Sequence, residues 1–371
     1  MPSAVVVGAG VFGASLAHRL AGSGWETTLV EQYVPGHVRA ASAGESRLIR
    51  FSHGAGSWYT RSASRALDLW LELERESGAQ LLVQAGVAWF AGDEDGWEAE
   101  SERVLTEEGI TTERLSPEEA ARLFPSFNGE GLSFVLVEPQ AGVLRARDAT
   151  RVLAEQAVAR GARLVTATAR PDGAAVVTGD EQFEADVVVW ACGAWLARLF
   201  PGLVDLRVTK QHVYFFGAPA DWQTPGVPAW VDYDGAVYGA GDLDGRGFKA
   251  SPDREGPEFD PDTDDRAPSA EGERAARGYL AFRFPTLADA PIVGTRTCPY
   301  SLTADTNFLV ARHPEHESVW LLGGGSGHGF KHGPALAEYV ERLLDGSEEP
   351  EPTFGLGPRD PGASLRTAGS R

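Results

Sequence analysis

Three glycines near the start of the chain have the spacing that binds a dinucleotide. Gly8, Gly10 and Gly13 form a GxGxxG pattern that follows a short apolar run and precedes a helical stretch. In such a pattern the first glycine permits a tight turn, the second lets the backbone approach a pyrophosphate, and the third lets helix and strand pack closely. Glu31 ends the next apolar run, where a carboxylate accepts hydrogen bonds from ribose hydroxyls. We therefore predict a βαβ dinucleotide site; a Gly-rich turn in an ordinary α/β domain is the alternative.

Two cations stand in sequence contexts that suggest an anionic ligand. Arg50 lies in the apolar run 48–51, which argues for partial burial rather than a surface ion pair. Lys331, one of only three lysines in the chain, directly precedes a predicted helix. The start of a helix is electropositive, so a lysine there is unfavourable unless a negative group lies beside it. A substrate carboxylate or a reduced cofactor would supply that charge.

The composition excludes several classes of protein. The chain has 371 residues, enough for two or three folding units, and a net charge of −20. Such an acidic surface repels nucleic acids and anionic membranes. Two cysteines cannot make a disulfide scaffold, and no apolar stretch reaches the ~20 residues of a membrane span. The N-terminus lacks the basic and apolar regions of a signal peptide, so we expect a cytoplasmic globular protein.

The remaining pattern predicts the sheets and helices that position these residues. The apolar strand 183–190 ends in a small-residue turn, as expected of a strand that returns to the nucleotide-binding sheet. Between residues 207 and 241 apolar and polar residues alternate and many are aromatic, which indicates an antiparallel sheet in a second domain. An amphipathic helix is predicted over 57–76, and a capping sequence at Ser116 starts another.

Patterns for other kinds of catalysis are missing. His313 and His316 are three residues apart, but Pro314 lies between them and no further ligand set surrounds them, so zinc is not expected. The sequence also lacks the GxSxG pattern of a serine nucleophile elbow. We therefore predict no metal centre.

Three blocks, taken in order, resemble the monomeric sarcosine oxidase family of FAD-dependent amine oxidases, which includes N-methyltryptophan and pipecolate oxidases. The first is the glycine pattern followed by residues 42–50, and the second is Tyr238 with residues 247–249. The third joins residues 296–300 to residues 325–331. This third block is the most specific, because few families combine Cys-x-Tyr with SGHGFK. The resemblance covers nearly the whole chain except about the last ten residues.

The resemblance implies an α/β plus α+β fold like that of D-amino-acid oxidase. A Rossmann-like FAD-binding domain is interleaved with an antiparallel-sheet substrate domain. We place the FAD-binding domain in residues 1–80, 142–205 and 290–361, the substrate domain in 81–141 and 206–289, and a disordered tail in 362–371.

The implied reaction is oxidation of a secondary or tertiary amino acid. In this family a hydride passes from the carbon next to nitrogen to flavin N5, the imine hydrolyses in water, and O2 reoxidises the flavin to give hydrogen peroxide. The partners implied are therefore a small amine and O2, and we expect a monomer.

The resemblance also implies how FAD is held. Cys298 matches the cysteine that forms a thioether with the flavin 8α carbon, and a free surface thiol is the alternative. Ala43 stands where family members often carry a histidine near the flavin. The residues implied to contact the cofactor are Gly8, Gly10, Gly13, Glu31, Ser42, Arg47, Cys298, Gly327, His328, Gly329 and Lys331.

Several side chains match catalytic positions of the family. Arg50 and Lys331 match the pair that grips the substrate carboxylate, where an arginine fork and a compact ammonium suit the ligand. Lys249 matches the lysine that activates O2, and Arg47 matches an arginine beneath the flavin. The residues implied to line the substrate side are Tyr238 and Tyr300, for which ordinary core packing is the alternative.

Two departures from the family pattern bear on the substrate. Asp253 stands where the sarcosine-type pattern has a histidine, and Ala55 stands where it has an acid. We therefore expect sarcosine to be a poor substrate and a larger or cyclic secondary amino acid to be a better one. The alternatives are a D-amino-acid or glycine oxidase with non-covalent FAD, an NAD(P)-dependent dehydrogenase, and a flavoprotein without turnover.

Overall fold

The computed structural model describes residues 1–179 and 181–363. One half of the molecule is built on a six-stranded sheet. Five of the strands are parallel, and β19 alone runs antiparallel to its neighbour. The strands, in spatial order, are β19 (Leu309–Arg312), β20 (Val319–Gly323), β13 (Val187–Trp190), β1 (Ser3–Val7), β2 (Glu26–Glu31) and β9 (Arg163–Thr166). The predicted βαβ unit and the returning strand are therefore confirmed.

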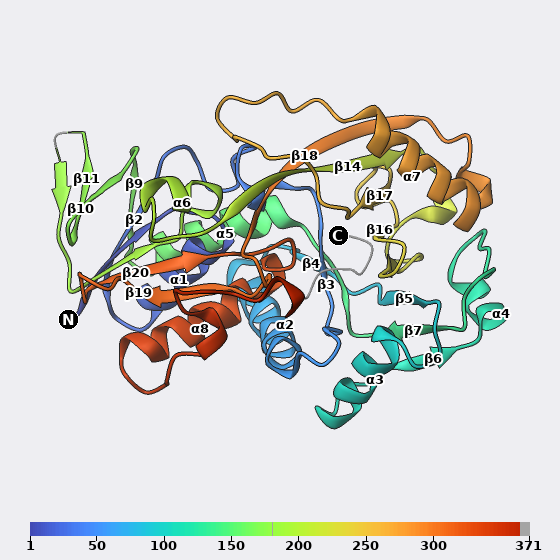
Figure 1. Ribbon diagram of the computed structural model, residues 1–371, viewed down its shortest axis with the longest axis horizontal. Coiled ribbons are helices and arrows are strands. Elements are labelled where there is room, and N and C mark those ends of the chain that lie inside the picture. The colour runs from blue at the N-terminus through green and yellow to red at the C-terminus, as the bar shows by residue number, and fades with distance from the viewer. Residues whose placement is uncertain (180, 364–371) are drawn as a thin grey trace.

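Helices cover this sheet because its central strand is apolar on both faces. Ala4 and Val6 of β1 pack in one core with α1 (Val11–Gly22), α5 (Ala146–Ala159) and α8 (Gly333–Leu344). Val5 and Val7 point the other way, into a second core with α6 (Leu196–Leu199). The long helix α2 (Ser57–Ser77) matches the predicted helix and packs beside α8 (Figure 1).

The second half of the molecule is built on an eight-stranded sheet. In spatial order its strands are β18 (Ile292–Leu302), β14 (Arg207–Phe216), β17 (Phe248–Pro252), β16 (Val237–Ala240), β15 (Ala229–Asp232), β5 (Val87–Ala91), β7 (Phe134–Glu138) and β6 (Glu113–Leu115). The expected antiparallel pairing is confirmed for most of these strands, but β15 and β5 pair in parallel. That pair joins two chain segments that lie more than a hundred residues apart, so local alternation could not reveal it.

Smaller elements complete the fold around this sheet. The helix α7 (Ala270–Arg283) packs on β14 and β17, and α3 (Trp97–Glu107) packs on β5. Ser116 forms the predicted capping box at the start of the short helix α4 (Pro117–Ala120). Two three-stranded sheets remain: β3 (Arg47–Ile49), β8 (Gly142–Leu144) and β4 (Leu82–Val83), and a separate β10 (Arg170–Asp172), β11 (Ala175–Thr178) and β12 (Glu181–Phe183).

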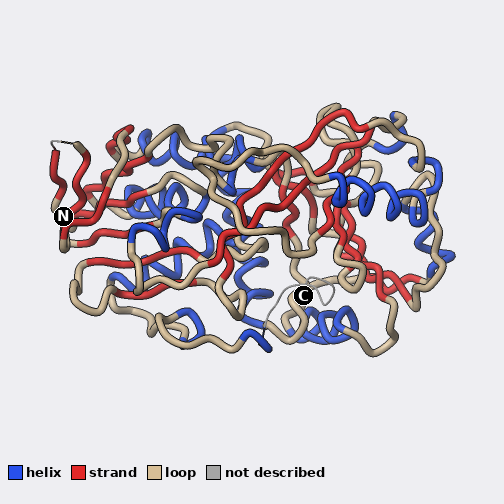
Figure 2. Tube along the Cα trace, turned by 45° about the horizontal axis from the view of Figure 1, so that its top comes forward, coloured by secondary structure: helices blue, strands red, loops and turns tan. Residues whose placement is uncertain are grey.

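Strands β14 and β18 run through the middle of the molecule and connect its two halves (Figures 1 and 2). They pair antiparallel from Arg207 opposite Leu302 to Phe216 opposite Ile292. The predicted domain boundaries stay a prediction. Strand β18 begins the segment that we assigned to the FAD-binding domain, and it pairs within the eight-stranded sheet. Residues 364–371 of the predicted tail lie outside the described residues. Within the described ranges, no helix combines the length and the apolar character that crossing a bilayer requires.

Candidate active site

A cavity of about 380 Å³ starts at the carboxyl ends of β1 and β2 and extends to β18. Ligands of open α/β sheets bind at this edge. The cavity is lined at the sheet by Gly8, Gly10 and Glu31, and at β18 by Cys298 and Tyr300. A single cleft therefore joins the glycine pattern to the cysteine, although these residues lie nearly 300 positions apart in the sequence.

The glycine turn fits a pyrophosphate. Gly8 has φ +101°, and a Cβ there would lie 2.6 Å from the carbonyl oxygen of Ala191. A Cβ on Gly13 would lie 1.9 Å from the carbonyl oxygen of Gly8, so Gly13 serves the packing of α1 and lies outside the cavity lining. At Gly10 the nearest protein atom would be 3.4 Å away, so the protein does not fill the space that the missing side chain leaves. That space opens into the cavity in front of the α1 N-terminus, where backbone N–H groups favour anions.

Glu31 and Ser42 lie beside the same glycine turn and accept hydrogen bonds from its backbone. The Glu31 carboxylate accepts hydrogen bonds from the backbone N–H groups of Ala9, at 2.7 Å, and Tyr33, at 2.9 Å. Burial raises the pKa of Glu31, while these backbone donors act in the opposite direction. Ser42 Oγ accepts a hydrogen bond from the N–H of Val11, at 2.9 Å. The carboxylate is held at the edge of the cavity, where it can meet a ribose.

Arg47 lies where the large cavity meets a second one. Its Nη2 donates to the carbonyl oxygen of Ala41 at 2.7 Å and lies 3.2 Å from the Sγ of Cys298. Its Nη1 donates to the carbonyl oxygen of Ser46 at 2.8 Å. The residues shared by the two cavity linings are Arg47, Ser326, Gly327 and Phe330. Cys298 is buried, so the structure does not support the alternative of an exposed thiol.

The second cavity, of about 80 Å³, carries both signs of charge. Arg50 and Lys331 line it together with Asp253. Its other walls are mainly aromatic and apolar, from Trp89, Val231, Tyr233, Val237 and Tyr238. The hydroxyls of Tyr238 and Tyr300 are 3.2 Å apart, so a hydrogen bond joins the wall of this cavity to the wall of the larger one. The arrangement suits a small molecule with a carboxylate.

The residues that contact Arg50 are bonded to a buried carboxylate, Glu138, which was not predicted from the sequence. Its Nη1 donates to the carbonyl oxygen of Ser52 at 2.6 Å, and its guanidinium lies 4.9 Å from the centre of a Trp89 ring. Glu138 accepts hydrogen bonds from Ser52 N at 2.9 Å and from Trp89 Nε1 at 2.7 Å. The available signal was one acidic residue at the end of the apolar run 134–137.

Lys331 is fully enclosed. Its Nζ donates to the carbonyl oxygen of His328 at 2.9 Å, and its own carbonyl oxygen accepts from Trp70 Nε1 at 2.8 Å. Burial, with a smaller contribution from the Arg50 charge, holds the pKa of Lys331 well below the usual lysine value. An anionic ligand between Arg50 and Lys331 would offset both positive charges.

Lys249 lies on the other side of Arg47, in a third cavity of about 30 Å³ that also borders Cys298. It belongs to β17 and is 1% exposed. Its Nζ lies 3.4 Å from the carbonyl oxygen of Ser46 and 4.8 Å from the centre of the Tyr238 ring. Burial, followed by the charge of Arg47, lowers the pKa of Lys249 to about 7. The Lys249 amine and its ammonium form are therefore both populated near neutral pH.

The structure brings most of the predicted site residues together. Gly8, Gly10, Glu31, Ser42, Arg47, Cys298, Tyr300, Gly327 and Gly329 line the large cavity, while Arg50, Tyr238, His328 and Lys331 line the second. His328, expected at the cofactor, and Lys331, expected at both the cofactor and the substrate carboxylate, line the second cavity. Asp262 also lines the large cavity and was not predicted, because its segment looked like a solvated acidic loop.

Comparison with known proteins agrees with this geometry. A model of the family described as DAO, FAD dependent oxidoreductase, matches residues 3–343. Monomeric sarcosine oxidase of Bacillus sp. (strain B-0618) is 31% identical over 363 residues, 93% of each chain. N-methyl-L-tryptophan oxidase of Yersinia pestis (strain Pestoides F) is 26% identical over 366 residues, 94% of this chain and 95% of that one.

Solved structures share the fold. L-proline dehydrogenase from P. horikoshii superposes with a TM-score of 0.83 at 22% identity, covering 95% of this chain and 96% of that one. Glycine oxidase from Bacillus cereus superposes with a TM-score of 0.79 at 18% identity, covering 97% and 99%. The predicted fold class is confirmed. The glycine turn, the cleft that runs from it and the family match over residues 3–343 agree: the chain belongs to the FAD-dependent oxidoreductase family.

Proposed function

We propose that this enzyme is an oxidase of a small secondary or tertiary amino acid, with O2 as electron acceptor and hydrogen peroxide as product. One observation carries the proposal: two cavities meet at Arg47, one suited to FAD and the other lined by a pair of cations, Arg50 and Lys331. Relatives named as sarcosine oxidase and N-methyl-L-tryptophan oxidase support it.

The residues of the second cavity would bind and orient the substrate. Arg50 and Lys331 grip the carboxylate, and the hydroxyl pair of Tyr238 and Tyr300 faces the rest of the molecule. Fixing the carboxylate holds the adjacent C–H bond in one orientation, which lowers the entropic cost of reaction. FAD, when bound, supplies the hydride acceptor and then the reductant of O2. Lys249 lies in its own pocket beside Arg47, and there it stabilises the negative charge that develops on O2.

Asp253 directs the choice of substrate. It lines the second cavity, and its charge raises the pKa values of Arg50 and Lys249 against the larger effect of their burial. An anion here favours a substrate that carries a positive charge away from its carboxylate. Ala55 does not line this cavity, so only one of the two departures noted in the sequence reaches the proposed substrate site.

A peroxide-coupled screen tests the proposal directly. The purified protein is offered N-methyl and cyclic amino acids, matched primary amino acids of both configurations, and amides of the active compounds. We expect peroxide from the N-substituted acids and little from the amides, which lack the carboxylate. Activity confined to glycine or D-amino acids would favour the alternative of a D-amino-acid or glycine oxidase.

The finer expectations also belong to this proposal. We infer that FAD is covalently bound through Cys298, which is supported by the burial of that thiol at the far end of the cofactor cavity. The monomeric state and the cytoplasmic location stay predictions from the sequence. Gel filtration of the flavin-loaded protein checks the first, and fractionation of the source cells checks the second.

A further inference from the structure

Three histidines meet at the second cavity, which one of them, His328, lines. His53 follows β3, His328 lies in the Gly-rich turn before α8, and His332 directly precedes α8. One ring nitrogen from each lies within 4.8 Å of the corresponding atoms of the other two. The three residues come from segments that are nearly 280 positions apart, so the sequence spacing did not indicate a cluster.

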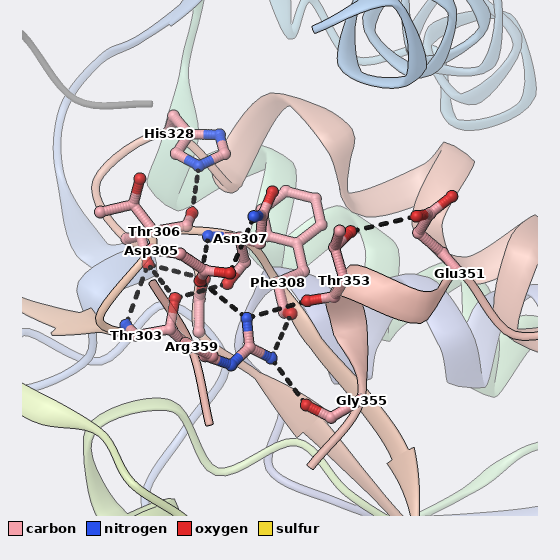
Figure 3. A network of polar contacts seen from close by, with 12 residues as sticks. Thr303, Asp305, Thr306, Asn307, Phe308, His328, Glu351, Thr353, Gly355 and Arg359 are labelled. Atoms are coloured by element: carbon pink, nitrogen blue, oxygen red, sulfur yellow. Dashed lines mark hydrogen bonds and ion pairs between the residues drawn. The ribbon is translucent and has the colours of Figure 1, made fainter. Parts of the chain in front are cut away.

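The outer nitrogens of these rings are held by oxygen atoms. His53 Nδ1 donates to the carbonyl oxygen of Phe51 at 2.8 Å, and His328 Nε2 donates to the carbonyl oxygen of Thr306 at 2.9 Å (Figure 3). His332 Nδ1 lies 3.0 Å from Ser62 Oγ. A carbonyl oxygen can only accept, so the outer nitrogens of His53 and His328 carry the hydrogen. In their neutral forms, their inner nitrogens then present lone pairs.

The inner nitrogens are the unusual feature of the cluster. The Nε2 atoms of His53 and His332 are buried and have no hydrogen-bond partner among residues 1–179 and 181–363. A buried ring nitrogen without a partner is unfavourable, so such an atom needs an explanation. Imidazole ligates metals in its neutral form, through the ring nitrogen that carries no hydrogen.

The surroundings of the cluster restrict its motion. The Tyr59 ring lies 5.6 Å from those of His53 and His332, and Phe308 stacks on His328 at 5.1 Å. The carbonyl that anchors His328 lies in a loop that Arg359 pins through an ion pair with Asp305, 2.8 Å long (Figure 3). These contacts limit the rings to small rotations, and their outer partners have the arrangement that orients metal-bound histidines.

We propose that His53, His328 and His332 form a three-imidazole site for a divalent transition metal ion, with Zn²⁺ as the probe. Imidazole suits zinc, copper and nickel, and three histidines with one open position form a known type of zinc coordination. Ligation at the usual Zn–N distance of about 2.0 Å draws the three nitrogens closer together through small ring rotations. Lys331 and Arg50 are cationic neighbours, so the site binds more weakly than one flanked by carboxylates.

Equilibrium dialysis of the flavin-loaded protein against Zn²⁺, followed by metal analysis, tests this site. We expect one Zn²⁺ per chain in the wild type and loss of that ion in H332Q and in H53Q. The matched control is the double variant H313Q/H316Q, which removes a half-buried stacked pair that could bind zinc adventitiously. This control should keep its zinc. The visible flavin spectrum verifies folding. Because the two ligand variants lie on different segments, the test remains valid if one of them does not fold.

A subtler variant separates a built site from chance binding. Ser62→Ala keeps all three ligands but removes the oxygen beside His332 Nδ1. Loss of such an outer partner typically weakens metal affinity about 10- to 100-fold. The proposal is overturned if the wild type retains no zinc, if H53Q and H332Q retain as much as the wild type, or if only H313Q/H316Q loses the ion.

Discussion

The Nη2 atom of Arg47 lies 3.2 Å from the Sγ of Cys298, although 251 positions separate the two residues in the chain. Hydrogen bonds to the carbonyl oxygens of Ala41 and Ser46 hold this guanidinium in place, so it cannot turn away from the sulfur. A fixed positive charge beside a cysteine sulfur stabilises the negative charge on which its nucleophilic reactivity depends. The pair therefore connects Cys298, the inferred site of flavin attachment, to β3, the strand that directly precedes Arg50.

Removal of the sulfur should release the flavin. We expect Cys298→Ser to leave no flavin in an acid precipitate, and Arg47→Gln to leave less than the wild type, because the charge beside the sulfur is lost. Cys192→Ser is the matched control, since Cys192 lines the same cavity near the glycine turn. Absorbance of pellet and supernatant after trichloroacetic acid gives the result. Wild-type flavin that appears in the supernatant would disprove the covalent link.

Lys249 should govern the reaction with O2. Its pKa of about 7 means that the ammonium is present below neutral pH and lost above it. We therefore expect the rate of flavin reoxidation by O2 to fall as the pH rises through about 7. Lys249→Met should lower this rate about 100-fold and remove its pH dependence, because the positive charge is gone. Stopped-flow mixing of substrate-reduced protein with O2 measures it.

A lysine outside the three cavities provides the control for this variant. Lys210 pairs with Asp265 at 3.0 Å, and Lys210→Met should leave the rate unchanged. Anaerobic reduction by substrate should be much less affected than reoxidation in the Lys249 variant. An equal loss in both half-reactions would argue against a role in O2 activation.

Lys331 should contribute mainly to substrate affinity. Loss of a charge-assisted hydrogen bond to a carboxylate costs about 2 kcal/mol, so Lys331→Met should raise KM about 30-fold. The effect should vanish for an amide of the same substrate, which offers no carboxylate. Steady-state peroxide assays with the acid and its amide supply the comparison, and an unchanged KM for the acid would remove Lys331 from the clamp.

Glu138 should act through Arg50. Its carboxylate accepts hydrogen bonds from Phe51, Ser52 and Trp89, two of which contact the arginine. In Glu138→Gln an NH2 group replaces one acceptor and faces these donors, so we expect a loss of about 3 kcal/mol in the free energy of unfolding.

The same variant should also raise KM, because Arg50 loses its support. Urea denaturation gives the stability and peroxide assays give KM. Glu113→Gln, an exposed change on the adjacent strand β6, should affect neither. Reduced stability with a normal KM would confine Glu138 to a structural role.

Glu98 should make stability depend on pH. Burial, with smaller contributions from Asp234 and Asp232, raises its pKa to about 8. The folded state then holds a proton that the unfolded state has lost, so stability falls as the pH rises from about 4.5 to about 8. Glu98→Gln should stabilise the protein by about 4 kcal/mol at pH 8 and by less than about 1 kcal/mol at pH 5. Thermal melts at the two pH values check this, and equal effects at both would contradict it.

The sequence predicted the parts of the site whose chemistry depends on short local patterns. The glycine turn and Glu31 could be placed because a single βαβ unit brings them together. The pairs Arg47–Cys298 and Arg50–Lys331 could be named only through the resemblance of distant blocks. Glu138 and the histidine cluster were missed because their partners come from separate segments, and no local pattern records a long-range contact.

The narrow overlap between the two large cavities has a practical consequence for directed evolution. Among residues 1–179 and 181–363, only Arg47, Ser326, Gly327 and Phe330 border both spaces. A randomised library limited to Val231, Val237 and Asp253 would reshape the smaller space without changing any residue that lines the larger one. Variants selected for new amines should therefore retain their yellow colour, so cofactor content need not be rescreened at each round.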